Sequence, residues 1–140
     1  MDIEKQIENN KKRNDKFLKE FEIWLNNKGL AAKTINNHLN NASLYINDYL
    51  NYHDVYSMEE GISFVDNFLS DWFVRKCMWF TAYSIKTTAA SIKKFYECMS
   101  DLNYVNKTAY KNLCNELKEN MDYYIDNVEE YNNFDEDDFW

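Results

Sequence analysis

Apolar side chains recur along this chain at spacings of three and four residues, the period at which one face of an α-helix returns. The pattern predicts five helices. They cover residues 3–25, 33–52, 57–73, a segment from 84 to a turn at 101–104, and 108–131. We therefore expect an all-α protein.

The first helix ends near Gly29, in the manner of a C-terminal glycine cap. Its apolar face holds Phe17, Phe21 and Trp24. Asn10 and Asn14 interrupt that face, so we expect the first turns to be exposed or frayed. The second helix has His38 beside its stripe, as a partly buried packing residue. The stripe itself consists of Ile35, Leu39, Ala42, Ile46 and Tyr49.

The third helix begins with a capping box, in which the Ser57 hydroxyl and the Glu60 carboxylate each satisfy a free backbone amide. Its apolar face continues from Ile62 to Phe73. The aromatic stretch 76–83 either prolongs this helix or forms a packed loop. Ser84 is the predicted N-cap of the fourth helix. The buried side of that helix is predicted to be Ala89, Ile92, Phe95, Tyr96 and Met99.

The fifth helix carries apolar residues at alternating spacings of four and three, which is a heptad repeat sustained over three heptads. Such a stripe is either an interaction seam for a second copy or another protein, or a cover for the core of the bundle. The candidate seam residues are Tyr110, Leu117, Met121, Tyr124 and Val128. Residues 132–140 follow as an acidic tail, expected to be flexible or docked through its aromatic side chains.

Composition supports helices joined by short polar connections. Proline is absent and glycine occurs twice among 140 residues, which leaves few tight turns. The length fits one domain over residues 1–131. No apolar run reaches the roughly 20 residues that span a bilayer. The first residues are polar, unlike a secretory signal. We therefore expect a cytoplasmic protein with no membrane partner.

The net charge of −8 is unevenly distributed. Residues 112–140 hold one lysine and ten carboxylates, whereas residues 1–111 are close to neutral. The lysines of the fourth helix either neutralise DNA phosphates or merely solvate an amphipathic helix. The acidic C-terminal part solubilises the chain, masks a basic patch in cis, or binds a basic partner.

Catalytic and metal-binding motifs are missing from the sequence. Gly29 and Gly61 stand alone, so there is no glycine-rich phosphate loop. His38 and His53 fall in no zinc-ligand spacing. The three cysteines form no CxxC pair and are expected to be buried, reduced thiols. We expect no enzyme activity, no cofactor and no bound metal.

Two motifs carry a family resemblance. Gly29-Leu30 is followed by Thr34-Ile35, and the run 92–96 reads Ile-Lys-Lys-Phe-Tyr. Together with Phe17, Phe21 and Trp24, these motifs resemble the core-binding domain of tyrosine recombinases, the phage integrases. The similarity covers about residues 15–110. It implies a SAM-like four-helix bundle, to which the fifth helix is an addition.

In that family the helices equivalent to the second and fourth here clamp duplex DNA. The resemblance therefore implies phosphate contacts by Lys33, Thr34, Lys86, Lys93 and Lys94. Asn37 joins these candidates, because asparagine hydrogen-bonds phosphates and adenine edges.

The family's arginine-histidine-tyrosine constellation has no counterpart. Arg75 is the single arginine after residue 20, and no histidine follows His53. The expectation is thus a non-catalytic DNA-binding module, such as one from a mobile element.

A protein-interaction module acting through the fifth helix is the alternative. One form of it is a DNA mimic, whose carboxylates are spaced like phosphates along a rigid helix. The residues that would serve are Glu116, Glu119, Asp122, Asp126, Glu129 and Glu130.

Overall fold

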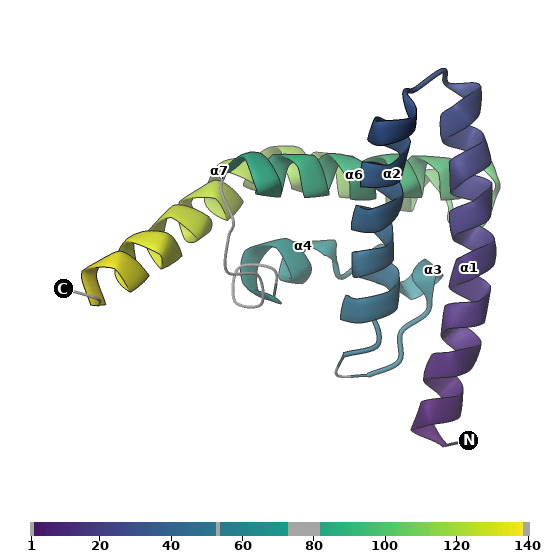
Figure 1. The fold of residues 1–140 in the computed structure, drawn as a ribbon, viewed down its shortest axis with the longest axis horizontal. Helices are drawn as coiled ribbons and strands as arrows, with labels where there is room; N and C mark the ends of the chain where they lie inside the picture. Colours follow the sequence, from purple (N-terminus) through teal and green to yellow (C-terminus); the bar gives the residue numbers. More distant parts are fainter. Residues whose placement is uncertain (1, 53, 73–81, 139–140) are drawn as a thin grey trace.

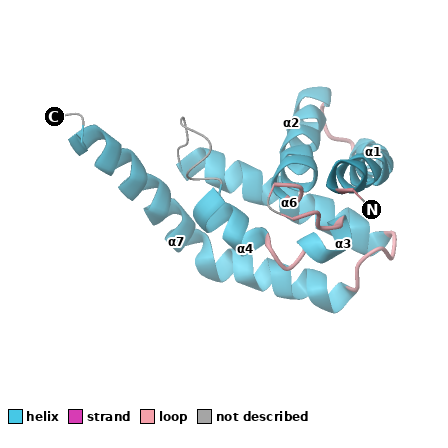
Figure 2. Ribbon diagram, turned by 90° about the horizontal axis from the view of Figure 1, so that it is seen from below, coloured by secondary structure: helices cyan, strands magenta, loops and turns pink. Residues whose placement is uncertain are grey.

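The computed structural model describes residues 2–52, 54–72 and 82–138, with side chains described as far as residue 130. The regular structure in this part is all helical, which confirms the all-α class. One hairpin consists of α1 (Ile3–Asn27) and α2 (Ala32–Ser43), and a second of α6 (Ala82–Asp101) and α7 (Lys107–Asp138). The hairpins cross steeply, with short helices packed beside them (Figures 1 and 2). The SAM-like arrangement stays a prediction.

Both ends of α1 have local caps. The Asp2 carboxylate accepts a hydrogen bond from the Glu4 amide at 3.0 Å. At the other end Gly29 has φ 77°, the left-handed conformation that glycine adopts without steric cost. The predicted glycine cap is therefore confirmed.

The first turns of α1 are exposed, as expected, with Ile3 56% exposed, but Asn10 and Asn14 themselves are buried. Asn10 is 7% exposed and Asn14 fully buried. Asn10 donates to Asn51 Oδ1 and to the Tyr56 carbonyl, both at 2.9 Å. Asn14 donates to Asn47 Oδ1 at 2.9 Å and to the Ile46 carbonyl at 3.0 Å. The amide nitrogens of both residues are therefore paired on burial, whereas Asn14 Oδ1 is buried without a hydrogen-bond partner in the described part of the chain.

The second predicted helix is continuous but changes its winding. After α2 the chain widens into a π-helical segment, η1 (Leu44–Tyr49). The Leu50 amide donates to the Tyr45 carbonyl at 3.0 Å, five residues back. Ile35, Ala42 and Ile46 of the predicted stripe are buried, and Leu39 and Tyr49 pack against the core.

The predicted third helix is broken into two pieces after Gly61. Its capping box is present, with Ser57 and Glu60 in their expected roles. The first piece, α3, covers only Met58–Gly61, and the chain resumes as α4 (Val65–Asn67) and η2 (Phe68–Trp72). The Gly61 carbonyl accepts from the Tyr45 hydroxyl and from the Phe64 amide. These bonds replace the bond from residue 65 that a continuous helix would need.

The fourth predicted helix corresponds to α6, whose predicted buried side is confirmed. Ser84 lies inside α6, which includes Ala82, so its assignment as the N-cap is wrong. Most of the aromatic stretch 76–83 lies outside the described residues. The helix ends as a Schellman motif, because Tyr104 donates to the Met99 carbonyl and Asn103, at φ 67°, to the Ser100 carbonyl.

The fifth predicted helix corresponds to α7, which runs seven residues past its predicted end at Tyr131 to Asp138. The backbone of 132–138 is thus helical, although these residues were expected to form a separate tail. No glycine or proline occurs there to end the helix. α6 packs on both α2 and α7. The end of α7 extends away from the other helices (Figure 1).

Candidate nucleic-acid interface

Acidic residues are absent from two 25-residue stretches of the sequence, 23–47 and 72–96. The first includes α2, and the second includes most of α6. These two helices pack directly against each other. The fold therefore joins two carboxylate-free segments into one surface, although the chain as a whole is strongly acidic.

The contact between α2 and α6 includes a group of polar interactions centred on Ser91. Its hydroxyl lies 2.8 Å from His38 Nδ1 and accepts from the Asn41 amide at 2.9 Å. The same hydroxyl is 3.0 Å from the Thr87 carbonyl. These bonds fix how the exposed sides of α2 and α6 are oriented relative to one another.

The α2 candidates are all exposed. Lys33, Thr34 and Asn37 lie within the first two turns of the helix. Thr34 is one turn before His38 and so points toward α6, whereas Lys33 and Asn37 share the outer side. The neighbouring carboxylates of α1, Asp15 and Glu22, border the opposite edge of α2.

The exposed strip of α6 is narrow and basic. Lys86, Ala90 and Lys93 are exposed and recur at helical spacing, and Lys94 is half-buried on the side toward α2. None of the three lysines forms an ion pair within the described part of the chain. We call the exposed side of α2 and α6 the basic face, which comprises Lys33, Thr34, Asn37, Lys86, Lys93 and Lys94.

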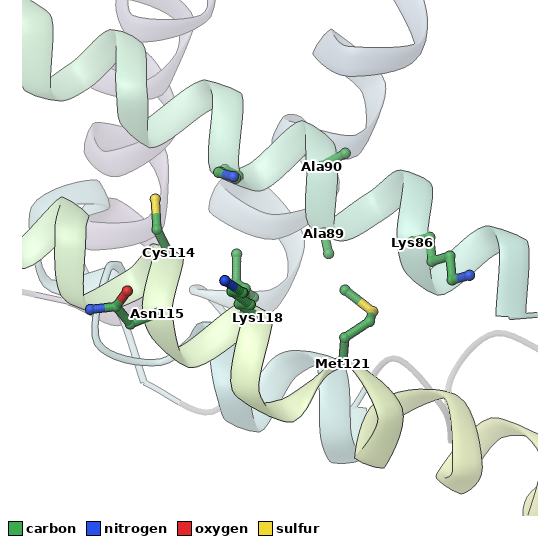
Figure 3. A pocket seen from close by; sticks show the side chains of 9 residues that line it. Lys86, Ala89, Ala90, Cys114, Asn115, Lys118 and Met121 are labelled. Atoms are coloured by element: carbon green, nitrogen blue, oxygen red, sulfur yellow. The ribbon is translucent and has the colours of Figure 1, made fainter.

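A groove of about 490 Å³ lies between α6 and α7. Ala89 and Met121 face each other across it, and Lys118 projects from α7 (Figure 3). Lys86 and Lys93 also line this α6–α7 groove. The remaining lining residues are Ala90, Cys114, Asn115 and Leu117. An apolar floor is thus bordered by three lysines.

The candidate residues divide between two places. Lys86 and Lys93 meet at the groove, while Lys94 lies beside His38 at the α2–α6 contact. No described contact joins Lys33 to the others. Lys118 was not among the predicted site residues, because it is the single basic residue in the acidic part of the chain. Its position next to Leu117 in the heptad repeat was the available signal.

Two titratable groups near this surface are perturbed. Burial, followed by the charge of Lys94, lowers the pKa of His38 below its usual 6.5. Burial, followed by Asp101, raises the pKa of the Cys98 thiol to about 12. The Cys98 thiol is therefore unreactive, because the thiolate is the nucleophile. Cys77 lies outside the described residues.

The candidate interaction seam lies against the core of the same chain. Leu117, Tyr124 and Val128 are buried, and Tyr110 and Met121 pack on the core. The Tyr124 hydroxyl donates to Asp66 Oδ1 at 2.6 Å, which ties α7 to α4. The side chains at these positions are thus engaged within the chain. The outward side of α7 carries exposed Glu119, Asp122, Asp126, Glu129 and Glu130.

A metal site and a membrane-spanning helix are both absent from the part of the chain that the structure describes. Within residues 2–52, 54–72 and 82–138, no group of three histidine, cysteine or carboxylate side chains lies close enough to hold a metal ion. In the same ranges no helix has the length and hydropathy required to cross a bilayer.

In comparisons with known proteins, no family model, no curated protein and no solved structure matched this chain. The resemblance to the core-binding domain therefore rests on the sequence motifs alone and stays a prediction.

Proposed function

We propose that this chain is a non-catalytic module that binds duplex DNA through the basic face. The observation that carries the proposal is the packing of α2, which has no carboxylate, on α6, which has none before Glu97. Neutralisation of phosphates dominates affinity for DNA. A surface without carboxylates is therefore the one that DNA approaches with the least electrostatic repulsion. The motifs that resemble the core-binding domain of tyrosine recombinases support the same two helices.

The chemistry of the face suits backbone contact more than base reading. Lys86, Lys93 and Lys94 supply charge, and Asn37 and Thr34 supply neutral hydrogen-bonding groups. Ala90 has a short side chain, so a phosphate backbone that lies over it can reach Lys86 and Lys93 on either side. Binding is expected to be weakly dependent on base sequence and strongly dependent on salt.

Fluorescence anisotropy with a labelled duplex, measured over a range of salt concentrations, tests the proposal. Replacing Lys86, Lys93 and Lys94 by Gln should weaken binding and reduce the slope of log K against log salt by about 3. The control replaces the exposed lysines Lys5, Lys11 and Lys107 and should keep most of the affinity. Absence of binding at low salt, both for the full chain and for a chain without residues 132–140, would refute the proposal.

A protein-interaction role is the second candidate, and one observation favours it. α7 presents exposed Asp122, Asp126, Glu129 and Glu130 on a helix that extends away from the body (Figure 2). The carboxylates of such a helix could take the place of DNA phosphates in the basic cleft of a DNA-binding protein. In that case the chain should displace DNA from a basic DNA-binding peptide. The variant with all four residues changed to their amides should not.

A further inference from the structure

We propose that the α6–α7 groove binds the C-terminal segment, residues 132–140, of a second copy of this chain. The occupant is identified by complementarity of charge and apolar character. The geometry of α7 then requires that the segment come from another molecule. The proposal concerns self-association and holds whether or not the chain binds DNA.

The groove has the size and lining of a binding site. Its volume of about 490 Å³ falls in the range of roughly 300–1,000 Å³ that holds small-molecule ligands. Leu117 is buried in its floor, and Met121 supplies a flexible thioether that adapts to different apolar shapes. The floor therefore offers a place for an aromatic side chain.

No described carboxylate forms an ion pair with the lysines around the groove. Lys86, Lys93 and Lys118 form no ion pair within the described ranges. By helical spacing, the nearest acidic positions are Asp122, one turn beyond Lys118, and Glu97, one turn beyond Lys93. Three lysines against these two carboxylates leave the groove with a net positive charge, which an acidic occupant would neutralise.

The C-terminal segment matches both requirements. Its sequence is Asn-Asn-Phe-Asp-Glu-Asp-Asp-Phe-Trp, with four consecutive carboxylates between aromatic residues. Carboxylates at 135–138 complement the three lysines, and Phe134, Phe139 and Trp140 complement the apolar floor. Aromatic anchors surrounded by charge are typical of residues that dominate binding at interfaces.

The segment cannot come from the same molecule while α7 is intact. α7 is one helix from Lys107 to Asp138, and Met121 already lines the groove. A rise of 1.5 Å per residue places residue 138 about 25 Å farther along the axis. Two copies can instead exchange segments about a two-fold axis, so that each groove is filled by the partner and the interface is isologous.

Sedimentation velocity on the full chain is the primary test. A dimer that dissociates on dilution in the micromolar range is expected. Deleting residues 132–140 should give a monomer, as should the triple variant Lys86→Glu, Lys93→Glu, Lys118→Glu. A control with Glu at Lys5, Lys11 and Lys107 has the same net charge and should still dimerise. Circular dichroism and thermal unfolding establish that each variant is folded.

Mixing the two monomeric variants sharpens the test. The truncated chain keeps its groove and the triple variant keeps its segment, so together they should form a heterodimer. A labelled peptide of residues 129–140 should bind the truncated chain, and the triple variant's groove at least ~10-fold more weakly.

Three results would overturn the proposal. The first is a dimer that survives deletion of the segment. The second is equal peptide binding by the truncated chain and the triple variant. The third is a full chain that stays monomeric, whether the peptide fails to bind any form or binds only the truncated one. If the full chain is a monomer, peptide binding restricted to the truncated chain would indicate that the groove takes the segment of its own molecule.

Discussion

Gly61 occupies a position where no larger residue fits. A Cβ there would lie 2.5 Å from Leu50 Cδ1 and 2.8 Å from the Tyr96 hydroxyl. Leu50 is fully buried, and the Tyr96 hydroxyl donates to the Met58 carbonyl at 2.8 Å, so neither neighbour can retreat freely. The φ of Gly61 is not in the left-handed region. Close approach to the core, and not an unusual backbone conformation, is therefore what requires a glycine here.

Gly61→Ala should therefore lower the free energy of unfolding by about 1–3 kcal/mol through overpacking. Urea denaturation followed by circular dichroism measures it. Ser63→Ala, at an exposed position two residues away, should change the value by less than about 0.5 kcal/mol. Equal effects at the two positions would show that the close approach is not as described.

His38 reports on the α2–α6 contact through its titration. Its pKa is lowered by burial and by Lys94, so the folded chain binds a proton less readily than the unfolded chain. The contribution of His38 to stability is thus present above pH 6.5 and is lost as the pH falls below it. Its imidazole resonances in an NMR titration should show a midpoint below 6.5.

Lys94→Gln should raise that midpoint, because it removes the second cause of the shift. Lys93→Gln is the matched control, since Lys93 lines the groove on the other side of α6. If both variants moved the midpoint equally, Lys94 would have no special proximity to His38.

At the scale of elements, α7 is held by a few large side chains. Leu113, Leu117, Tyr124 and Val128 are buried along one side of it. Polar bonds add to this, since Asn127 donates to the Ser70 carbonyl at 3.3 Å. The heptad spacing predicted a helix with one apolar side, and this side contacts the chain's own core.

Leu117→Ala should lower the free energy of unfolding by about 2–5 kcal/mol, because it leaves a cavity beneath α7. Glu119→Ala, exposed on the same helix, should stay within about 0.5 kcal/mol of the parent. Both are measured by urea denaturation at two protein concentrations. The part of the effect that does not change with protein concentration is the contribution of Leu117 to the core, and a value below about 1 kcal/mol would contradict its burial.

Local features of the sequence predicted the helix caps well. The features that were not predicted, such as the break after Gly61, depend on contacts between residues far apart in the sequence. The capping box at Ser57 and the glycine at position 29 act on neighbouring residues, so their roles could be deduced. The break after Gly61 depends on the Tyr45 hydroxyl, 16 residues away in sequence. The burial of Asn14 depends on Asn47, 33 residues away.

The candidate site was predictable in part for the same reason. Exposure of Lys33, Lys86 and Lys93 follows from helical periodicity on each helix separately. The meeting of Lys86 and Lys93 with Lys118 depends on how α6 and α7 pack, which no local pattern specifies.

At the scale of the molecule, charge is segregated along the chain and in space. Helix α2 and residues 82–96 of α6, which contain no carboxylate, form one region, and α7 carries exposed carboxylates toward its far end. Repulsion between those carboxylates and a polyanion acts over about 10 Å at moderate salt, so it opposes DNA binding most at low salt.

Deleting residues 132–140 removes four of the 24 carboxylates and should tighten DNA binding several-fold at low salt. The gain should shrink as salt is added, because screening already weakens the repulsion. Anisotropy titrations of both chains measure it. A control that keeps the length but has amides at residues 135–138 should reproduce the gain if charge is its cause.

Two asparagine pairs, Asn10 with Asn51 and Asn14 with Asn47, fix the position of α1 along its own axis relative to the end of the first hairpin. Apolar contacts such as those of Phe17 and Phe21 tolerate a slide of one helical turn, because one aromatic ring can replace another. A hydrogen bond from Asn10 to Asn51 or from Asn14 to Asn47 does not survive that slide. A single buried asparagine is known to fix register in coiled coils. The two pairs here lie one turn apart and act together, so they select one alignment of the hairpin from several of similar apolar burial.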